Sequence, residues 1–232
     1  MVNIDFHKSV FISILREIYS DPLLRNILGF KGGTAALLFY ELPRFSVDLD
    51  FDLLDREKKG PVFEKLKELL PRFGILKQAD DKRYTLSFIL NYQKGERNLK
   101  VEVSKRPLKS EFVLKNYLGI SMLVMKKEDM VTAKLSALLT RKRLATRDIF
   151  DLWFFLKNNW QLNKEGVLEK TGLSFTTALK RAANKVKLVK KTELLAGLGD
   201  LLDNKKKAWV KEKLINETVF YLSLHRKIHG KS

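Results

Sequence analysis

The chain contains no cysteine, only three histidines, no apolar run that approaches the length of a membrane span, and far fewer acidic than basic residues. Without cysteine it has no disulfide, no thiolate metal site and no catalytic thiol. A membrane span needs about 20 apolar residues, and the first five residues lack the basic and apolar regions of a signal peptide. These absences predict a cytoplasmic protein that does not enter a membrane.

Positive charge is abundant. Forty-five Lys and Arg against 27 Asp and Glu give a formal net charge of +18. An excess of that size favours polyanionic partners through counterion release and electrostatic steering. A merely solubilising surface is the alternative that composition leaves open. Charge therefore points to a polyanion without saying which one.

Hydrophobic periodicity predicts an α+β half followed by a helical half. In the first half, helices are expected over 6–19, 34–41 and 62–70, and strands over 47–54, 84–91 and 99–104, the last two joined by a hairpin turn at Lys94-Gly95-Glu96. After Pro107, helices are expected over 127–157, 174–190 and 191–228. We therefore expect two domains, an α/β domain over 1–107 and a helical domain over 108–232 that completes the active-site cleft.

The first motif with chemical meaning is Gly32-Gly33-Thr34, followed after 13 residues by Asp48-Leu49-Asp50. Two glycines before a helix let main-chain N–H groups approach a phosphate, and the Thr34 hydroxyl adds a donor. On a strand, Asp48 and Asp50 share one face while Leu49 lies on the other. Such a pair of carboxylates is typical of a site for Mg²⁺ or Mn²⁺, although a solvated strand face is the alternative.

Glu102 is a third candidate ligand. It shares a face with Lys100 and Ser104 on the expected strand 99–104, while the valines between them face the other way. If that strand lies beside the first acidic strand, Glu102 joins Asp48 and Asp50 as a metal ligand, or accepts the proton of an attacking hydroxyl. An ordinary outward-facing glutamate stays open as the alternative.

A second constellation lies in the helical half. Lys134 and Arg141 are seven residues apart and share a helix face, so they are suited to binding a triphosphate. Asp148 and Asp151 are three residues apart and also share a face, where they are placed to fix an arginine or to position a base or water. Of the two we expect Asp151 in the catalytic site and Asp148 in an orienting role. A solvated helix with ordinary ion pairs is the alternative.

These residues carry a family resemblance. The segments Phe30-Lys31-Gly32-Gly33-Thr34-Ala35-Ala36 and Arg44-Phe45-Ser46-Val47-Asp48-Leu49-Asp50-Phe51 resemble the signature of polymerase-β-like nucleotidyltransferases. More narrowly, with the Lys134…Arg141 helix and Arg147-Asp148-Ile149-Phe150-Asp151, they resemble the AbiEii/AbiGii toxins of type IV toxin–antitoxin systems. The resemblance covers two blocks, roughly 30–54 and 130–156, and leaves Asp52 outside the matched pattern.

The resemblance implies a polymerase-β-like nucleotidyltransferase sheet with flanking helices, followed by a helical domain. It implies that Asp48 and Asp50 hold the metal and that Gly33-Thr34 grips phosphate. It further implies transfer of a nucleotidyl group from an NTP to an acceptor, with pyrophosphate released, tRNA as the acceptor and a separately encoded antitoxin as a partner. A small-molecule or protein acceptor, and a non-catalytic RNA-binding or NTP-binding module, remain open.

Other residues receive structural interpretations. Trp153, Phe154, Phe155 and Trp160 are expected in the core, and His225 and His229 on a solvated face. The basic runs Lys205–Lys207 and Lys185–Lys191 contain few aromatic residues, so they favour contacts with an RNA backbone over stacking on bases.

Overall fold

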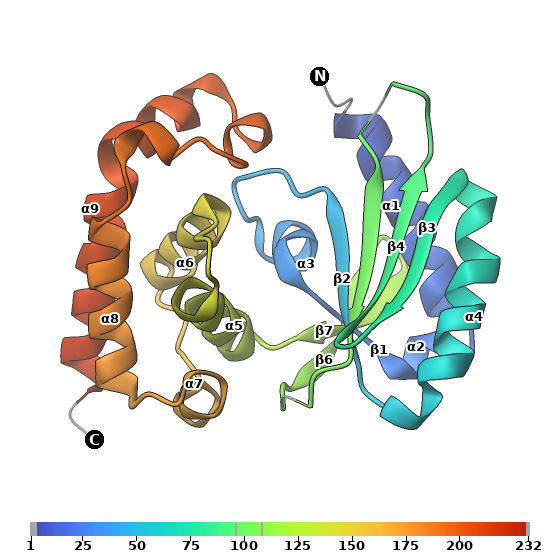
Figure 1. The fold of residues 1–232 in the computed structure, drawn as a ribbon, viewed down its shortest axis with the longest axis horizontal. Helices are drawn as coiled ribbons and strands as arrows, with labels where there is room; N and C mark the ends of the chain where they lie inside the picture. Colours follow the sequence, from blue (N-terminus) through green and yellow to red (C-terminus); the bar gives the residue numbers. More distant parts are fainter. Residues whose placement is uncertain (1–3, 96, 108, 231–232) are drawn as a thin grey trace. The chain divides into compact units, whose positions relative to one another are not determined.

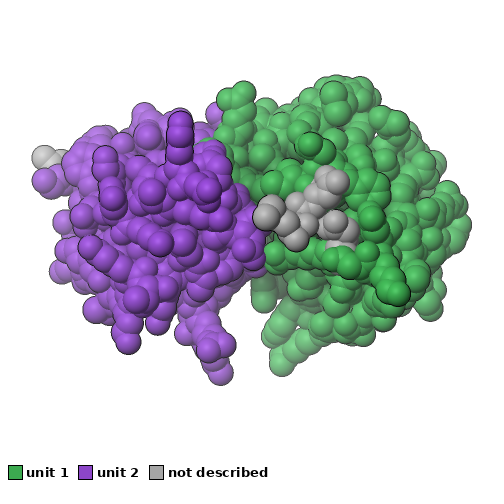
Figure 2. Space-filling view, turned by 90° about the horizontal axis from the view of Figure 1, so that it is seen from above, with its two compact units in different colours: residues 1–107, 111–125 green, residues 108–110, 126–232 purple. Residues whose placement is uncertain are grey.

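The computed structural model describes residues 4–95, 97–107 and 109–230, whose helices and strands are drawn in Figure 1. The chain divides into two compact units, which Figure 2 shows in two colours. The first unit comprises residues 1–107 and 111–125, and the second comprises residues 108–110 and 126–232. The first contains a sheet with flanking helices and the second is helical, which confirms the predicted α+β class.

A mixed sheet of seven strands forms the centre of the first unit, in the order β3-β4-β5-β2-β1-β7-β6. Strand β2 lies in the middle, parallel to β5 on one side and antiparallel to β1 on the other. The strands are β1 Leu28–Lys31, β2 Asp48–Leu53, β3 Ile75–Lys82, β4 Thr85–Asn91, β5 Leu99–Ser104, β6 Phe112–Tyr117 and β7 Ile120–Met125. The antiparallel pairing of β4 and β5 confirms the predicted hairpin, although Glu96 of its predicted turn lies outside the described residues.

The alternation predicted for β2 is confirmed. Leu49 and Phe51 are fully buried and Leu53 is nearly so, whereas the three aspartates between and before them are half-buried. The Phe51 ring lies 5.3 Å from that of Phe30 and 6.5 Å from that of Tyr19 in helix α1 (Ile4–Ser20). Burial of these apolar side chains fixes which face of β2 turns inward, and so leaves its carboxylates together on the other face.

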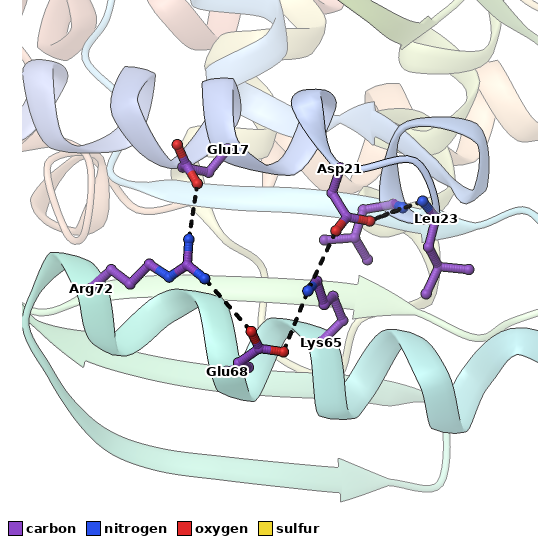
Figure 3. A network of polar contacts seen from close by, with 7 residues as sticks. Glu17, Asp21, Leu23, Lys65, Glu68 and Arg72 are labelled. Atoms are coloured by element: carbon purple, nitrogen blue, oxygen red, sulfur yellow. Dashed lines mark hydrogen bonds and ion pairs between the residues drawn. The ribbon is translucent and has the colours of Figure 1, made fainter.

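Helices flank this sheet: besides α1, they are α2 Leu24–Ile27, α3 Gly32–Tyr40 and α4 Lys59–Leu69, with 3₁₀ turns η1 Arg56–Lys58 and η2 Leu70–Phe73. A chain of ion pairs links α1 to α4 and η2 (Figure 3). Glu17 and Glu68 both contact Arg72, at 3.4 and 3.6 Å, and Lys65 lies 3.7 Å from Asp21. Because most of these groups are exposed, they align the helices but add little stability.

The strands β6 and β7 are a difference from the sequence prediction, which assigned no strand beyond residue 107. They form a hairpin whose turn residues Leu118 and Gly119 have φ values of +50° and +79°. Two positive φ values suit a tight hairpin turn, but leucine is an unusual residue in that conformation. The usual turn signal is therefore missing, and the apolar run Ile120–Met125 does not alternate clearly enough to indicate a strand.

The second unit consists of helices α5 Lys127–Thr140, α6 Thr146–Lys157, α7 Lys164–Thr171, α8 Phe175–Lys187 and α9 Asn204–His229, with 3₁₀ turns η3 Lys191–Glu193 and η4 Gly199–Leu201. The side chains of Asn163, Ser174 and Asp203 cap α7, α8 and α9 by accepting a hydrogen bond from the main-chain N–H three residues on. Helix α8 lies against α9 and contacts α5, and α9 also packs on α6 (Figure 1).

The predicted aromatic core of this unit is confirmed for three of its four residues. Trp153, Phe155 and Trp160 are at most 7% exposed, whereas Phe154 is only partly buried. The rings of Phe155 and Trp160 stack with their centroids 4.4 Å apart, and Trp153 lies 4.2 Å from Trp209 of α9. Among the residues that the structure describes, no helix combines the length and apolar character of a membrane span.

The expected solvation of His225 is wrong. This residue continues the buried stripe of α9 formed by Val210, Leu214, Thr218 and Leu222, and only 2% of it is exposed. Lysines on the other faces of α9 obscured that stripe in the sequence. The His225 Nε2 donates a hydrogen bond to the Leu156 carbonyl, 3.1 Å away, while its Nδ1 has no hydrogen-bond partner.

Burial lowers the pKa of His225 below its usual value near 6.5, helped by the nearby His229 and opposed by the hydrogen bond to Leu156. Because the folded-state pKa is lowered, neutral His225 contributes stability above about pH 6.5, and this is lost as the pH falls through the folded-state pKa. We predict that acidification from about pH 7.5 to about pH 5.5 lowers the urea midpoint of the wild type more than that of His225→Gln. The matched variant His229→Gln should keep most of the wild-type shift, and an equal shift in His225→Gln would contradict this account.

Candidate active site

The glycine turn connects β1 to the first turn of α3. Gly32 has a φ of +78°, and a Cβ added there would meet the Asp50 carboxylate and lie 2.9 Å from the Asp50 Cβ. Only glycine combines this backbone conformation with this close approach. The start of α3, whose main-chain N–H groups favour anions, is thereby held against the acidic strand.

Arg44 packs beneath this turn. It is only 5% exposed and donates a hydrogen bond to the Phe45 carbonyl over 2.8 Å. A Cβ on Gly33 would come within 2.6 Å of the Arg44 Nη2 and 2.8 Å of the Ser46 Oγ. The sequence prediction gave Arg44 no role, because nothing in the pattern showed that a charged side chain would be buried under the helix start. Its position adds positive charge to an anion-favouring turn.

Thr34 is fully buried. Its hydroxyl donates to the main-chain carbonyl of Asp48, and its oxygen lies 3.0 Å from the Ser46 Oγ. The predicted contact of this hydroxyl with phosphate stays a prediction. The observed bond instead ties α3 to the first residue of β2.

A second buried side chain holds the residue before Asp48. His7 is fully buried, with its Nε2 3.0 Å from the Val47 carbonyl oxygen and its Nδ1 2.6 Å from the Tyr92 hydroxyl. Since a carbonyl only accepts, Nε2 donates to Val47 and Nδ1 accepts from Tyr92. Side chains thus hold two successive carbonyls of the segment that carries Asp48. A lone histidine on an apolar helix face offered no sequence signal for this contact.

The acidic residues meet across β2 and β5. The register of the parallel strands β2 and β5 places Asp50 opposite Glu102 and Asp48 opposite Lys100, so these side chains share one face of the sheet. Asp52 forms an ion pair with Lys31 of β1, which compensates its charge. The Glu102 Oε1 lies 2.8 Å from the Lys100 Nζ. The structure therefore brings Asp48, Asp50 and Glu102 together on one face, as the sequence predicted, with a lysine beside the glutamate.

The donor set suits a hard divalent cation. Asp48 and Asp50 offer carboxylate oxygens on one face, and the absence of a Cβ at Gly32 leaves space for the Asp50 carboxylate. Across the described parts of the chain, no three His, Asp or Glu side chains are grouped to hold a metal by themselves. Mg²⁺ commonly takes one or two protein carboxylates and completes its shell with water and substrate phosphates. The role of Glu102 as a third ligand stays a prediction.

The second constellation is a buried ion cluster within the second unit. The Lys134 Nζ lies 2.9 Å from the Asp148 Oδ1 and 2.8 Å from the Asp151 Oδ2. The Arg141 Nη1 lies 2.6 Å from the Asp148 Oδ2. The Asp148 and Asp151 side chains are at most 1% exposed, and a carboxylate buried to that degree needs ionic partners.

Asp148 bridges both cations and so sets their spacing. The Lys134 side chain is 17% exposed, whereas that of Arg141 is 46% exposed. Arg141 is therefore held by one nitrogen and still open to solvent, which suits a guanidinium that binds phosphate. Lys134, Arg141, Asp148 and Asp151 are grouped as predicted, but the expected shared helix face of Lys134 and Arg141 is wrong. Helix α5 ends at Thr140 and Arg141 is its C-cap in an extended conformation, so their common contact with Asp148 brings the two cations together. The catalytic roles stay predictions.

Comparison with known proteins matches residues 13–207 to the model of the nucleotidyltransferase AbiEii toxin family of type IV toxin–antitoxin systems. The chain belongs to the AbiEii family. The match includes both the glycine turn with its acidic strand and the Lys134 cluster, so this AbiEii protein is a nucleotidyltransferase, as the resemblance in the sequence implied. No curated protein matches the chain.

Solved structures agree with this assignment. A candidate nucleotidyltransferase from Helicobacter pylori shares 25% identity, with a TM-score of 0.65, over 99% of this chain and 97% of its own. The protein JHP933 from Helicobacter pylori also shares 25% identity, with a TM-score of 0.62, over 97% of this chain and 93% of its own. The nucleotidyltransferase toxin MenT4 from Mycobacterium tuberculosis has the same fold at 17% identity, with a TM-score of 0.52, over 94% of this chain and 93% of its own. The AbiEii protein thus has a nucleotidyltransferase fold along nearly its whole length.

The glycine turn yields a test. We predict that Gly32→Ala lowers the rate of nucleotidyl transfer by about 100-fold, because the new Cβ displaces the Asp50 carboxylate from its position. Gly172→Ala is the matched control, since Gly172 also has a positive φ (+67°) but nothing within 4 Å of an added Cβ. Both variants carry backbone strain, so thermal unfolding should shift in both while activity falls only in the first. Equal activities would show that the close approach to Asp50 is not needed.

The ion cluster yields a second test. We predict that Asp148→Asn lowers the free energy of unfolding by about 3–5 kcal/mol, because it leaves Lys134 and Arg141 without their shared carboxylate. The exposed pair Lys67–Glu64, with Nζ and Oε2 3.8 Å apart, offers the control. Glu64→Gln should cost less than about 1 kcal/mol. Urea unfolding measures both, and a small loss for Asp148→Asn would mean that the cluster is not held together by this carboxylate.

Proposed function

We propose that this protein transfers a nucleotidyl group from an NTP to the 3′ end of an RNA, with tRNA as the acceptor and pyrophosphate as the second product. The observation that carries the proposal is the close approach of the α3 start at Gly32 to the Asp50 carboxylate on β2. That contact puts an anion-favouring helix start beside a cation-favouring strand. A metal-bound NTP presents both kinds of charge.

The first unit holds the reacting end of the nucleotide in this proposal. Asp48 and Asp50 bind Mg²⁺, or Mn²⁺, while the main-chain N–H groups at Gly32 and Gly33 contact phosphate oxygens. When bound, the metal neutralises charge on the phosphates and lowers the pKa of an oxygen that it coordinates. Glu102 lies beside Asp50 and either joins the metal ligands or accepts the proton of the attacking hydroxyl.

The cations of the ion cluster in the second unit are suited to binding phosphates of the NTP. Lys134 and Arg141 bind the phosphates that leave as pyrophosphate, and Asp148 keeps the two cations in place. Asp151, buried against the Lys134 Nζ, sets the position and charge of that ammonium group. On this ground Asp151 is a positioning residue for Lys134, since losing it leaves Lys134 with one carboxylate fewer.

Net charge and family membership support the proposed acceptor and partner. A net charge of +18 suits an RNA acceptor in the cytoplasm. The family of the chain belongs to type IV toxin–antitoxin systems, and we propose that a separately encoded antitoxin limits its activity.

The test is transfer of label from each of the four NTPs, in Mg²⁺, to total cellular RNA. We predict that label enters a tRNA-sized species and that Asp48→Asn with Asp50→Asn lowers the rate by about 10³-fold, because the metal loses its carboxylates. Asp52→Asn is the matched control, since Asp52 lies on the same face of the same strand but pairs with Lys31. It should keep most of the activity.

Three results would overturn parts of this proposal. Label that enters the protein itself or a small molecule, with none in RNA, would move the acceptor to another class. Full activity of the Asp48→Asn, Asp50→Asn variant would remove these carboxylates from the reaction. Equal losses in that variant and in Asp52→Asn would show that strand charge in general, and not this pair, is required.

A further inference from the structure

The positive charge is divided unevenly between the two units. Residues 108–110 and 126–232 contain 25 Lys and Arg against 11 Asp and Glu, whereas residues 1–107 and 111–125 contain 20 against 16. The second unit therefore carries +14 of the net +18. A polyanion bound through charge has most to gain from contacts with this unit.

Two basic segments that are distant in sequence run side by side in this unit. The Lys185 Nζ donates to the main-chain carbonyls of Leu139 and Arg141, over 3.1 and 3.3 Å. The Thr146 hydroxyl donates to the Glu193 carbonyl over 3.3 Å. One contact thus holds the beginning of the loop between α5 and α6, and the other holds its end. The loop and the segment 185–193 are therefore aligned along their lengths.

The side chains on these aligned segments are exposed cations. We call the set Lys142, Arg143, Lys187, Lys190 and Lys191 the basic surface. Each member is exposed, and none of them makes an ion pair or side-chain hydrogen bond with another described residue. Five neighbouring like charges repel one another, and a polyanion relieves that repulsion.

The basic surface adjoins the ion cluster along the chain. Its loop follows Arg141, which pairs with Asp148, and leads into α6, which carries Asp148 and Asp151. A strand of phosphates lying on the surface would therefore pass next to Arg141. Segments 141–143 and 187–191 contain no aromatic residue, so they offer contacts with phosphates and no platform for stacking bases.

We propose that the basic surface binds the phosphate backbone of the RNA acceptor. This inference rests on the proposed function, because it names the surface that receives the acceptor of that reaction. The surface reads charge and not sequence. It binds a phosphate backbone, while the choice among nucleic acids depends on other contacts.

The test measures RNA binding without NTP, so that it does not depend on transfer. A variant with four neutral replacements, Lys142→Gln, Arg143→Gln, Lys190→Gln and Lys191→Gln, is compared with the wild type by titration of fluorescent tRNA over a range of salt concentrations. We expect the slope of log affinity against log salt to fall by about 3, since each phosphate contact contributes about 0.7–0.9. Affinity near physiological salt should fall by about 100-fold.

The control removes the same number of charges from the first unit, at exposed lysines: Lys58→Gln, Lys67→Gln, Lys77→Gln and Lys94→Gln. This variant should bind tRNA with nearly the wild-type slope. Circular dichroism and thermal unfolding should be unchanged in both variants, because every replaced side chain is exposed.

The outcomes separate this inference from the proposed function. Unchanged RNA affinity in the basic-surface variant overturns the inference. This holds even if the basic surface is then found to bind an acidic protein. Equal losses in the two variants also overturn it, because total charge would then explain binding. The Asp48→Asn, Asp50→Asn variant should bind tRNA like the wild type while it fails to transfer. A further outcome is that the wild type labels no RNA at all while the basic-surface variant still loses tRNA binding. In that case the proposed function fails and the basic surface remains an RNA-binding surface.

Discussion

The structure of the candidate site depends on the contact between the first turn of α3 and strand β2. Gly32 has no Cβ and a positive φ, and for that reason the helix start approaches the Asp50 carboxylate. The Thr34 hydroxyl then bonds to the Asp48 carbonyl, and His7 bonds to the carbonyl before it. A helix start that favours anions and carboxylates that favour cations are thus fixed together. This arrangement supports the proposal that the site binds a metal-bound triphosphate.

The ion cluster of the second unit is also held by contacts between opposite charges, but here buried carboxylates fix the position of cations. Two buried carboxylates hold Lys134, and one of them also holds Arg141 while leaving that guanidinium about half exposed. The desolvation of Asp148 and Asp151 is offset only while both cations stay in place. The basic loop that follows Arg141 extends positive charge from this cluster over an exposed surface. Phosphates of a nucleotide and of an RNA would therefore be recognised by neighbouring parts of the same unit.

Much of the fold and the composition of the site could be predicted from sequence, because the relevant signals are local. Alternation placed Asp48 and Asp50 on one face of a strand. Helical spacing indicated that Lys134 and Arg141 belong together, although Arg141 lies just beyond the end of α5 and meets Lys134 through Asp148. What could not be predicted depends on contacts between distant segments. The burial of Arg44 beneath Gly33, of His7 against Val47 and of His225 in the stripe of α9 follows from packing. The β6–β7 hairpin was missed because Leu118 occupies a turn position where glycine or asparagine is usual. The side-by-side course of the two basic segments depends on Lys185 and Thr146, whose partners lie 44–47 residues away.

The central claim is that Asp48 and Asp50 bind a metal that in turn binds the NTP. Calorimetric titration of a non-hydrolysable NTP analogue, repeated at increasing Mg²⁺ concentration, tests it most directly. The account predicts that the wild type binds the analogue more tightly as Mg²⁺ rises, and that this dependence is lost when both aspartates are replaced by asparagine. An affinity that responds to Mg²⁺ equally in the wild type and in that variant would contradict the claim.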